Sequence, residues 1–216
     1  MSGESRVVQL WRHPVKSLQG ERLDAVAVAG RGVVGDRGWG VRDCGSGALL
    51  SAKREPQLLL AAAAVGGEGV VVSLPDGVGR VGREADEAML ELLGRPVAIE
   101  VAPAVGPAFV DDAPLHLLTV AALGSWDVRR FRPNVLLDTP LDLDDLVGER
   151  LAIGGVVVTI DKRTRRCAMT TAEQPGLRRD VGVLRTLARE RQLCQGVYAR
   201  VVRPGRIAVN DSVRVT

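Results

Sequence analysis

Residues 157–176, VVTIDKRTRRCAMTTAEQPG, place a cysteine in a setting that suggests chemistry. The β-branched apolar run at 156–160 is typical of a buried strand. Five charged residues follow within the six positions 161–166, and then comes Cys167. Cations near a cysteine favour its thiolate, the form that attacks electrophiles and ligates soft metals. A small cysteine packed beside a solvated strand end explains the same residues equally well, so these residues alone leave both interpretations open.

The loop after this cysteine also contains polar groups. Thr170 and Thr171 offer hydroxyl donors, and Pro175-Gly176 is a turn signal that ends the loop.

Length and composition indicate a soluble globular protein. The chain has 216 residues, 46% hydrophobic and 25% charged, enough for one large or two small domains. It has no apolar run of the roughly 18 residues that a membrane span needs, and residues 1–11 do not resemble a secretory signal. Three cysteines at irregular spacing argue against a disulfide framework. We therefore expect a cytoplasmic protein with no membrane partner.

The basic residues point to a discrete anionic ligand. Of the 29 basic residues only Lys16, Lys53 and Lys162 are lysines, which leaves 26 arginines. Arginine presents the better fork for a phosphate or carboxylate. A nucleic-acid binder would pair basic patches with aromatic stacking platforms, but aromatic residues are only 3% of the chain. We expect a small-molecule ligand and no nucleic-acid partner.

The element pattern predicts a mostly β protein of the α+β class, with a few helices. Glu84 to Leu93 and Val181 to Arg191 have the apolar spacing of amphipathic helices, and Thr119 is placed to cap a short helix that runs to Gly124. Residues 58–65 fit either a strand or a helix. Short strands with frequent glycines predict barrel-like antiparallel folds. They are expected at 6–13, 23–29, 33–34, 39–42, 70–74, 97–101, 135–137, 156–160, 197–202, 207–209 and 213–215. Pro103 and Pro107 suggest a boundary between domains at 1–103 and 104–216.

One glycine motif does not predict a dinucleotide site. Residues 30–35 match G-x-G-x-x-G after a predicted strand, but Asp36-Arg37-Gly38 does not begin the helix that such a site requires. A tight turn between strands is the favoured interpretation, and Arg37 is then a cation held on that turn.

Other candidate residues are weaker when taken singly. Lys16-Ser17 follows a strand end, where a solvated turn is the simpler interpretation. His13 and His116 lack metal-ligand spacing and are expected to be structural. Cys44 lies beside an acidic residue in a glycine turn, and Cys194 is expected to be a packing residue.

In chain order, these pieces resemble the MOSC proteins, in particular those with a MOSC N-terminal β-barrel domain, such as the mitochondrial amidoxime reducing component and its bacterial relatives. The resemblance covers nearly the whole chain and rests on six motifs: Pro14-Val15-Lys16-Ser17, Gly35-Asp36-Arg37-Gly38-Trp39, Pro114-Leu115-His116-Leu117-Leu118-Thr119, Arg130-Phe131-Arg132-Pro133-Asn134, Arg166-Cys167 with Thr170-Thr171, and Gly196-Val197-Tyr198 with Pro204-Gly205.

The resemblance implies a fold, a cofactor and a site. Two barrel-like β halves are expected, a MOSC N-terminal barrel over 1–103 and a MOSC core over 104–216. A molybdenum cofactor would bind between them, with Cys167 as the metal ligand and catalytic residue. The implied cofactor-binding residues are Lys16, Ser17, Arg37, Thr119, Arg132, Asn134, Arg166 and Tyr198.

The implied activity is reduction of an N-hydroxylated small-molecule substrate. Electrons would come from a separate protein of the ferredoxin or cytochrome type. Where the family usually has an aspartate followed by proline, the chain has Ala172-Glu173-Gln174-Pro175, which puts the shape of the substrate pocket in question. Two alternatives stay open: a non-redox carrier of the cofactor or of cysteine-bound sulfur, and a binding module for another anionic ligand with Cys167 inert.

Overall fold

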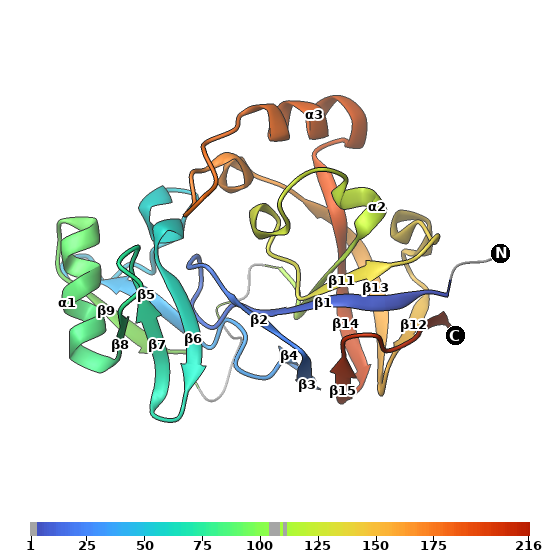
Figure 1. Cartoon of the computed structure of the whole chain (residues 1–216), viewed down its shortest axis with the longest axis horizontal. Coiled ribbons are helices and arrows are strands. Elements are labelled where there is room, and N and C mark those ends of the chain that lie inside the picture. Colours follow the sequence, from blue (N-terminus) through green and yellow to red (C-terminus); the bar gives the residue numbers. More distant parts are fainter. Residues whose placement is uncertain (1–3, 104–108, 110–111) are drawn as a thin grey trace.

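The computed structural model describes residues 4–103, 109 and 112–216. It is mostly β with few helices, as the sequence predicts, and two groups of strands lie side by side (Figure 1). The strands are β1 Arg6–Arg12, β2 Glu21–Leu23, β3 Ala25–Ala29, β4 Gly32–Val33, β5 Trp39–Asp43, β6 Ala62–Gly66, β7 Gly69–Ser73, β8 Gly79–Arg80, β9 Val97–Val101, β10 Leu115–Thr119, β11 Val135–Asp138, β12 Arg150–Ile153, β13 Val156–Arg165, β14 Cys194–Arg203, β15 Gly205–Ala208 and β16 Val213–Val215.

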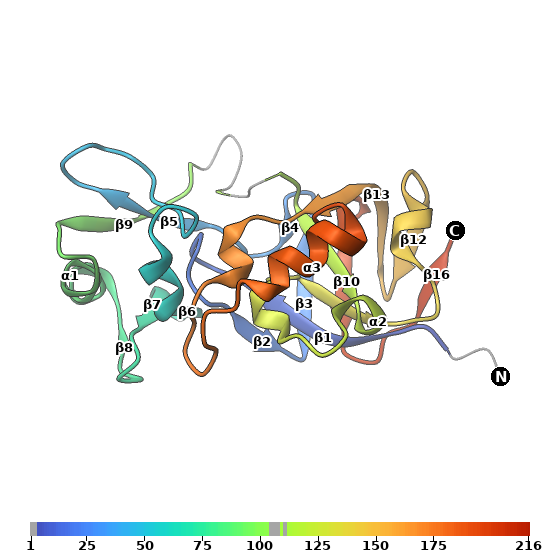
Figure 2. The same ribbon diagram turned by 90° about the horizontal axis from the view of Figure 1, so that it is seen from above.

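The helices are short, and most of them connect strands. The α-helices are α1 Gly82–Leu93, α2 Val120–Leu123 and α3 Gly182–Arg191, and the 3-10 helices are η1 Pro56–Leu60, η2 Val128–Arg130, η3 Leu143–Leu146 and η4 Ala168–Thr171. Helix α1 lies at the outer end of the group that contains β5 to β9, whereas α3 lies beside β14 and η4 (Figures 1 and 2).

The largest sheet contains strands from both halves of the chain. Its order is β16-β12-β13-β14-β10-β11-β1-β2, so the first strand pairs antiparallel with β11. An isolated bridge between Arg6 and Ser212 brings β1 beside the residue that precedes β16. A separate sheet, β15-β3-β4, again pairs a late strand with an early one. Strands β1 and β3 lie in the first half of the sequence but pair with strands of the second half.

Two main hydrophobic cores underlie this arrangement. One contains most of the buried apolar residues of β10 to β16 together with Val7, Leu10, Val26, Val28 and Val33. The other contains buried residues between 15 and 97 and, from the second half, Ala172. The domain boundary at 103/104 stays a prediction, because it adjoins residues outside the described ranges.

Most predicted elements are confirmed, with informative differences. The helix predicted at 84–93 is α1, and Gly94 ends it with φ +70°, a conformation that glycine adopts without strain. The ambiguous stretch 58–65 divides into η1 and β6. The strand expected to end at 160 was predicted too short, since β13 continues through the charged residues to Arg165. Among the residues described, no helix is long and apolar enough to cross a membrane.

Candidate cofactor site

A cavity of about 520 Å³ is lined by residues from both halves of the chain. Its volume lies in the range typical of small-molecule sites. Six of the thirteen lining residues are lysines or arginines, and the one carboxylate among the described lining residues is Asp112. The lining residues are Lys16, Ser17, Ser51, Lys53, Asp112, Lys162, Arg163, Arg165, Arg166, Cys167, Met169, Thr170 and Tyr198.

Cys167 lies where the long strand β13 gives way to the 3-10 helix η4. Its side chain is a free thiol, and the residue is exposed. The Thr170 hydroxyl donates to the Cys167 carbonyl oxygen at 3.0 Å, and the Thr171 hydroxyl donates to the Ala168 carbonyl oxygen at 2.7 Å. The two hydroxyls that the sequence suggested as ligand donors therefore stabilise the turn that presents the cysteine.

Arg130 stabilises this turn through hydrogen bonds to its backbone. Its guanidinium is buried and donates to three backbone carbonyl oxygens, those of Thr170 at 3.3 Å, Ala172 at 3.2 Å and Arg178 at 2.7 Å. Three bonds from one rigid, planar donor fix the path of the chain on both sides of the loop that follows η4. Arg130 belongs to one of the six motifs of the sequence but was not predicted as a site residue.

The same turn is attached to the first half of the chain. Ala172 belongs to the core formed by residues between 15 and 97, and Met169 packs against that core. The buried side chain of Gln19 donates to Gln174 at 2.7 Å. The cysteine is thus positioned by contacts to both halves.

Five of the nine predicted site residues line the cavity and four do not. Those that do are Lys16, Ser17, Arg166, Cys167 and Tyr198. The other four are Arg37, Thr119, Arg132 and Asn134.

Arg37 and Arg132 lie in a buried polar layer next to the cavity residues. The Arg37 guanidinium is ion-paired with Asp36 and donates to the Arg132 carbonyl oxygen at 3.4 Å. The Arg132 guanidinium donates to the Leu18 carbonyl oxygen. Arg37 lies on a turn, as expected, but only 13% of its side chain is accessible, because the turn folds against His13.

Three predicted residues share an uncommon backbone conformation. Ser17, Arg37 and Arg132 have φ values of +71°, +49° and +53°. Non-glycine residues pay for this left-handed conformation with strain, which persists where the surrounding structure enforces it and is found preferentially at functional sites. The three come from separate loops, which gives an independent reason to regard this region as functional.

Asn134 and Thr119 have structural partners. The Asn134 side chain is fully buried; it accepts from the His116 N–H at 3.1 Å and donates to the Trp11 carbonyl oxygen at 3.4 Å. The Thr119 hydroxyl accepts from the Ala122 N–H at 3.0 Å and so caps α2, as the sequence predicts. Thr119 also lines a different pocket, beside Pro140.

The two histidines show that this polar layer is positive. Burial, followed by the charges of Arg132 and Arg37, holds the pKa of His13 well below its ordinary 6.5. Burial and the charge of Arg166 lower the pKa of His116 in the same way. Both rings are therefore neutral at physiological pH, and three guanidinium groups remain charged around them. Such a layer favours an anion in the adjoining cavity.

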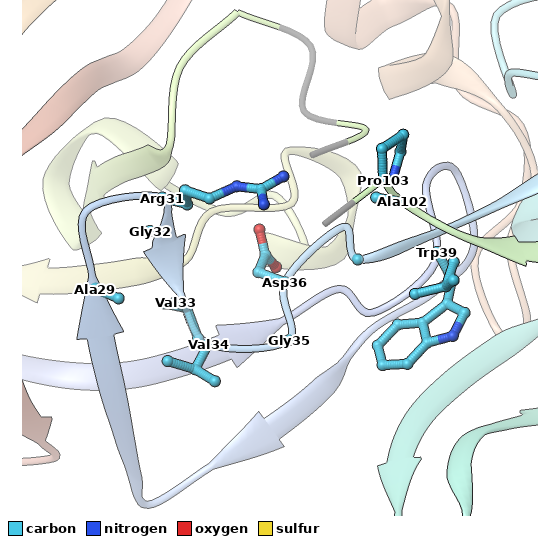
Figure 3. A pocket seen from close by; sticks show the side chains of 12 residues that line it. Ala29, Arg31, Gly32, Val33, Val34, Gly35, Asp36, Trp39, Ala102 and Pro103 are labelled. Carbon is cyan, nitrogen blue, oxygen red and sulfur yellow. The ribbon is translucent and has the colours of Figure 1, made fainter. Parts of the chain in front are cut away.

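The glycine motif at 30–35 forms a turn between strands. Its residues Gly32 and Val33 make up β4, which pairs with β3, so no helix begins there. The turn does line a separate pocket of about 320 Å³, together with Asp36, Trp39 and Pro103 (Figure 3).

Several cavity residues could not be recognised from the sequence. Ser51, Lys53 and Lys162 lie in unremarkable contexts along the chain, and only the fold brings them to one cavity. The three lysines did stand out as the exceptions in an arginine-rich chain, which was the one available signal. Among the described residues, no group of three or more His, Cys, Asp and Glu side chains is placed to hold a metal ion.

Two family models match the chain. The MOSC N-terminal beta barrel domain matches residues 4–90, and the MOSC domain matches residues 111–214. The YUAD protein from Bacillus subtilis has a solved structure that covers 100% of this chain and 97% of its own, at 12% identity and a TM-score of 0.50, a likeness of fold alone.

A second solved structure, YiiM from Geobacillus stearothermophilus, covers 49% of this chain and 55% of its own, at 16% identity and a TM-score of 0.39. A search of curated proteins found no match.

Proposed function

Because the chain belongs to the MOSC domain proteins, a family associated with the molybdenum cofactor, we propose that it binds this cofactor and reduces N-hydroxylated substrates. Its electrons would come from a separate donor protein of the ferredoxin or cytochrome type. The observation that carries the proposal is the exposed Cys167 thiol on the wall of a cavity that is also lined by six lysine and arginine residues.

The residues that line the cavity fit the molybdenum cofactor. A cysteine thiolate is a suitable ligand for a soft, redox-active metal. The phosphate of the cofactor requires charge-assisted donors, and the Lys16 ammonium and Arg166 guanidinium line the same cavity. Arg37 and Arg132 lie behind these residues and add positive charge through the buried layer. Tyr198 lines the wall and contacts the His116 ring edge-on at 5.6 Å between centroids.

The reaction converts an N–OH group to N–H and water with two electrons and two protons. When bound, the cofactor supplies the electron-transfer chemistry, and the protein orients it and its substrate. The Lys16 and Lys162 ammonium groups and the Tyr198 hydroxyl carry protons at the cavity wall. His13 and His116 are neutral at pH 7, so neither ring acts as an imidazolium acid. Protons would therefore enter from the wall residues or from water.

The test compares three assays of cofactor-loaded protein with benzamidoxime as substrate. With NADH alone we expect no benzamidine; with a chemical reductant, or with NADH, a ferredoxin or cytochrome and its reductase, we expect benzamidine by chromatography. Cys167→Ala should remove that product. If loaded protein reduces no N–O substrate with any donor but passes cofactor or sulfur to an acceptor protein, the carrier function should replace this one.

A further inference from the structure

All three lysines of the chain line the same cavity. The chain has 29 lysines and arginines, and the lysines, Lys16, Lys53 and Lys162, come from three distant positions in the sequence. No lysine of the chain therefore lies elsewhere, although Arg163, Arg165 and Arg166 line the same cavity. This distribution suggests that the three lysine positions use a property that arginine does not provide.

Three arginines at or near the cavity hold the backbone through hydrogen bonds to carbonyl oxygens. Arg130 donates to three carbonyl oxygens, Arg132 to that of Leu18, and Arg166 to that of Phe131 at 2.8 Å. A guanidinium is suited to this task because its donors form a rigid fork. A lysine ammonium is a compact charge on a flexible stem, suited to following a ligand that enters and leaves.

Lys53 is placed at the cavity by a contact of its own loop. The N–H of Ala52 donates to the buried Ser17 hydroxyl at 2.9 Å, which ties the loop to the segment that contains Lys16. Lys53 is exposed, and within the described ranges its ammonium group forms no hydrogen bond or ion pair. Its charge is thus available to a ligand.

Lys162 projects into the same cavity from β13. Its ammonium group pairs with Asp112 at 2.7 Å, and about half of each side chain is accessible, 51% and 55%. The hydrogen bond to Asp112 raises the pKa of Lys162, so the ammonium stays charged at neutral pH. An exposed pair of this kind is weak, and an incoming anion can replace the Asp112 carboxylate.

We infer that Lys53 and Lys162 form a subsite for an acidic group, a carboxylate or a phosphate, on the substrate. The substrate class is then an N-hydroxylated compound that carries such a group away from its N–O bond. This assignment rests on the proposed function for the reaction, but the binding of the anion does not. Asp112 competes with the ligand for Lys162 and so sets how strongly the subsite prefers acidic substrates to neutral ones.

The scarcity of lysine allows a direct binding test. Reductive methylation with ¹³C-formaldehyde labels three lysines and the N-terminal amine, and Lys→Arg variants assign the signals. Addition of benzoate or phenyl phosphate should shift the Lys53 and Lys162 signals saturably, whereas benzamide should not. The anion that saturates at lower concentration identifies the group as carboxylate or phosphate. Equal movement of the N-terminal signal would show general ionic attraction and overturn the subsite.

The same titration on cofactor-loaded protein separates substrate binding from cofactor binding. If the two lysine signals still respond to the anion, they face the substrate. If loading alone shifts them and the anions then have no effect, the lysines serve the cofactor phosphate and the inference is wrong.

Kinetics of the loaded protein provide the second test. The ratio of kcat/KM for 4-carboxybenzamidoxime to that for benzamidoxime should fall about fivefold in Lys53→Gln and in Lys162→Gln, the effect of one partly exposed ion pair. The ratio should rise in Asp112→Asn and keep its value in Arg83→Gln, an exposed control on α1.

The outcomes of the two proposals differ. If both substrates are reduced but the ratio is the same in all variants, the subsite is refuted and the reductase function stands. If neither substrate is reduced while the lysine signals respond to the anions, the anion subsite stands and the reductase function fails.

Discussion

Arg166 donates a 2.8 Å hydrogen bond to the carbonyl oxygen of Phe131, and its guanidinium carbon lies 5.7 Å from the centroid of the Phe131 ring. The next carbonyl along the chain, that of Arg132, accepts a bond from Arg37 in the first half. Two adjacent peptide groups therefore connect the residue before Cys167 to the N-terminal loops. This short segment fixes the distance between the two sides of the candidate site.

Replacing Cys167 by serine should remove most of the bound molybdenum, because the hydroxyl is a far poorer ligand for a soft metal. The measurement is metal content by mass spectrometry after expression in a cofactor-competent host. Cys44→Ser and Cys194→Ser are the matched controls, since neither cysteine lines the cavity. Equal metal loss in all three variants would contradict the assignment of Cys167.

Arg130→Met should destabilise the fold by about 3 kcal/mol, because three carbonyl oxygens lose their donor in a buried place. Denaturant unfolding measures this. The exposed Arg83→Met should change stability by less than about 0.5 kcal/mol. A loss in Arg130→Met no larger than that of the control would show that the loop around η4 is held by other contacts.

Arg37→Ala should lower both stability and cofactor retention. The Asp36 carboxylate, whose side chain is 1% accessible, loses its ion-pair partner but keeps the hydrogen bond from the His13 N–H, and breaking a buried pair costs about 3–5 kcal/mol. The comparison is Arg42→Ala, which breaks the more exposed Arg42–Glu100 pair at a cost of about 1 kcal/mol or less. If the two variants melt alike, the buried ion pair contributes no more than a surface one. If adding Asp36→Asn to Arg37→Ala restores the stability, the unpaired carboxylate is the cause of the decrease.

Stability should fall on acidification from pH 7 to pH 5. Both histidines have pKa values well below 6.5 in the folded state, so the unfolded chain binds more protons below that pH. Above about pH 7.5 the histidines do not change the free energy of unfolding. Below pH 6.5 each histidine lowers this free energy by up to about 1.4 kcal/mol per pH unit of acidification. The hydrogen bond from Arg80 lowers the pKa of Asp76 to about 2, so this carboxylate affects stability only below about pH 4.

Two measurements check this pH dependence. Melting temperatures should be constant from pH 8 to pH 7 and decrease below pH 6.5. Because the chain has two histidines, their ring signals can be followed separately by NMR, and neither should titrate near pH 6.5. A midpoint at that value for either ring would show that the ring is solvated.

Much of the fold was predictable from local sequence. Strand β1, helix α1 with Gly94 at its end, and the capping of α2 by Thr119 follow from patterns within a few residues. The pairing of β1 with β11 and of β3 with β15 did not, because pairing depends on packing between residues far apart in the chain. For the same reason the sequence did not show that the early strands join the later sheet.

The site was predictable in its centre and less so at its edges. Motifs identified Cys167, Lys16, Ser17, Arg166 and Tyr198, all of which line one cavity. Motifs did not distinguish residues that face a ligand from residues that hold the backbone. Asn134 is the clearest case, since both ends of its amide bond to the main chain.

The pairing of β3 with β15 has a consequence for biosynthesis. Contacts between residues at opposite ends of a chain give a high contact order and slow folding. On the ribosome, β1 and β3 can pair early with β2 and β4, but the other edge of each strand has no partner until β11 and β15 have been made. Chaperones that shield exposed strand edges should therefore associate with nascent chains for most of translation. Ribosome-bound chains stopped after residue 140 should remain more sensitive to protease at β3 than chains that include residue 210.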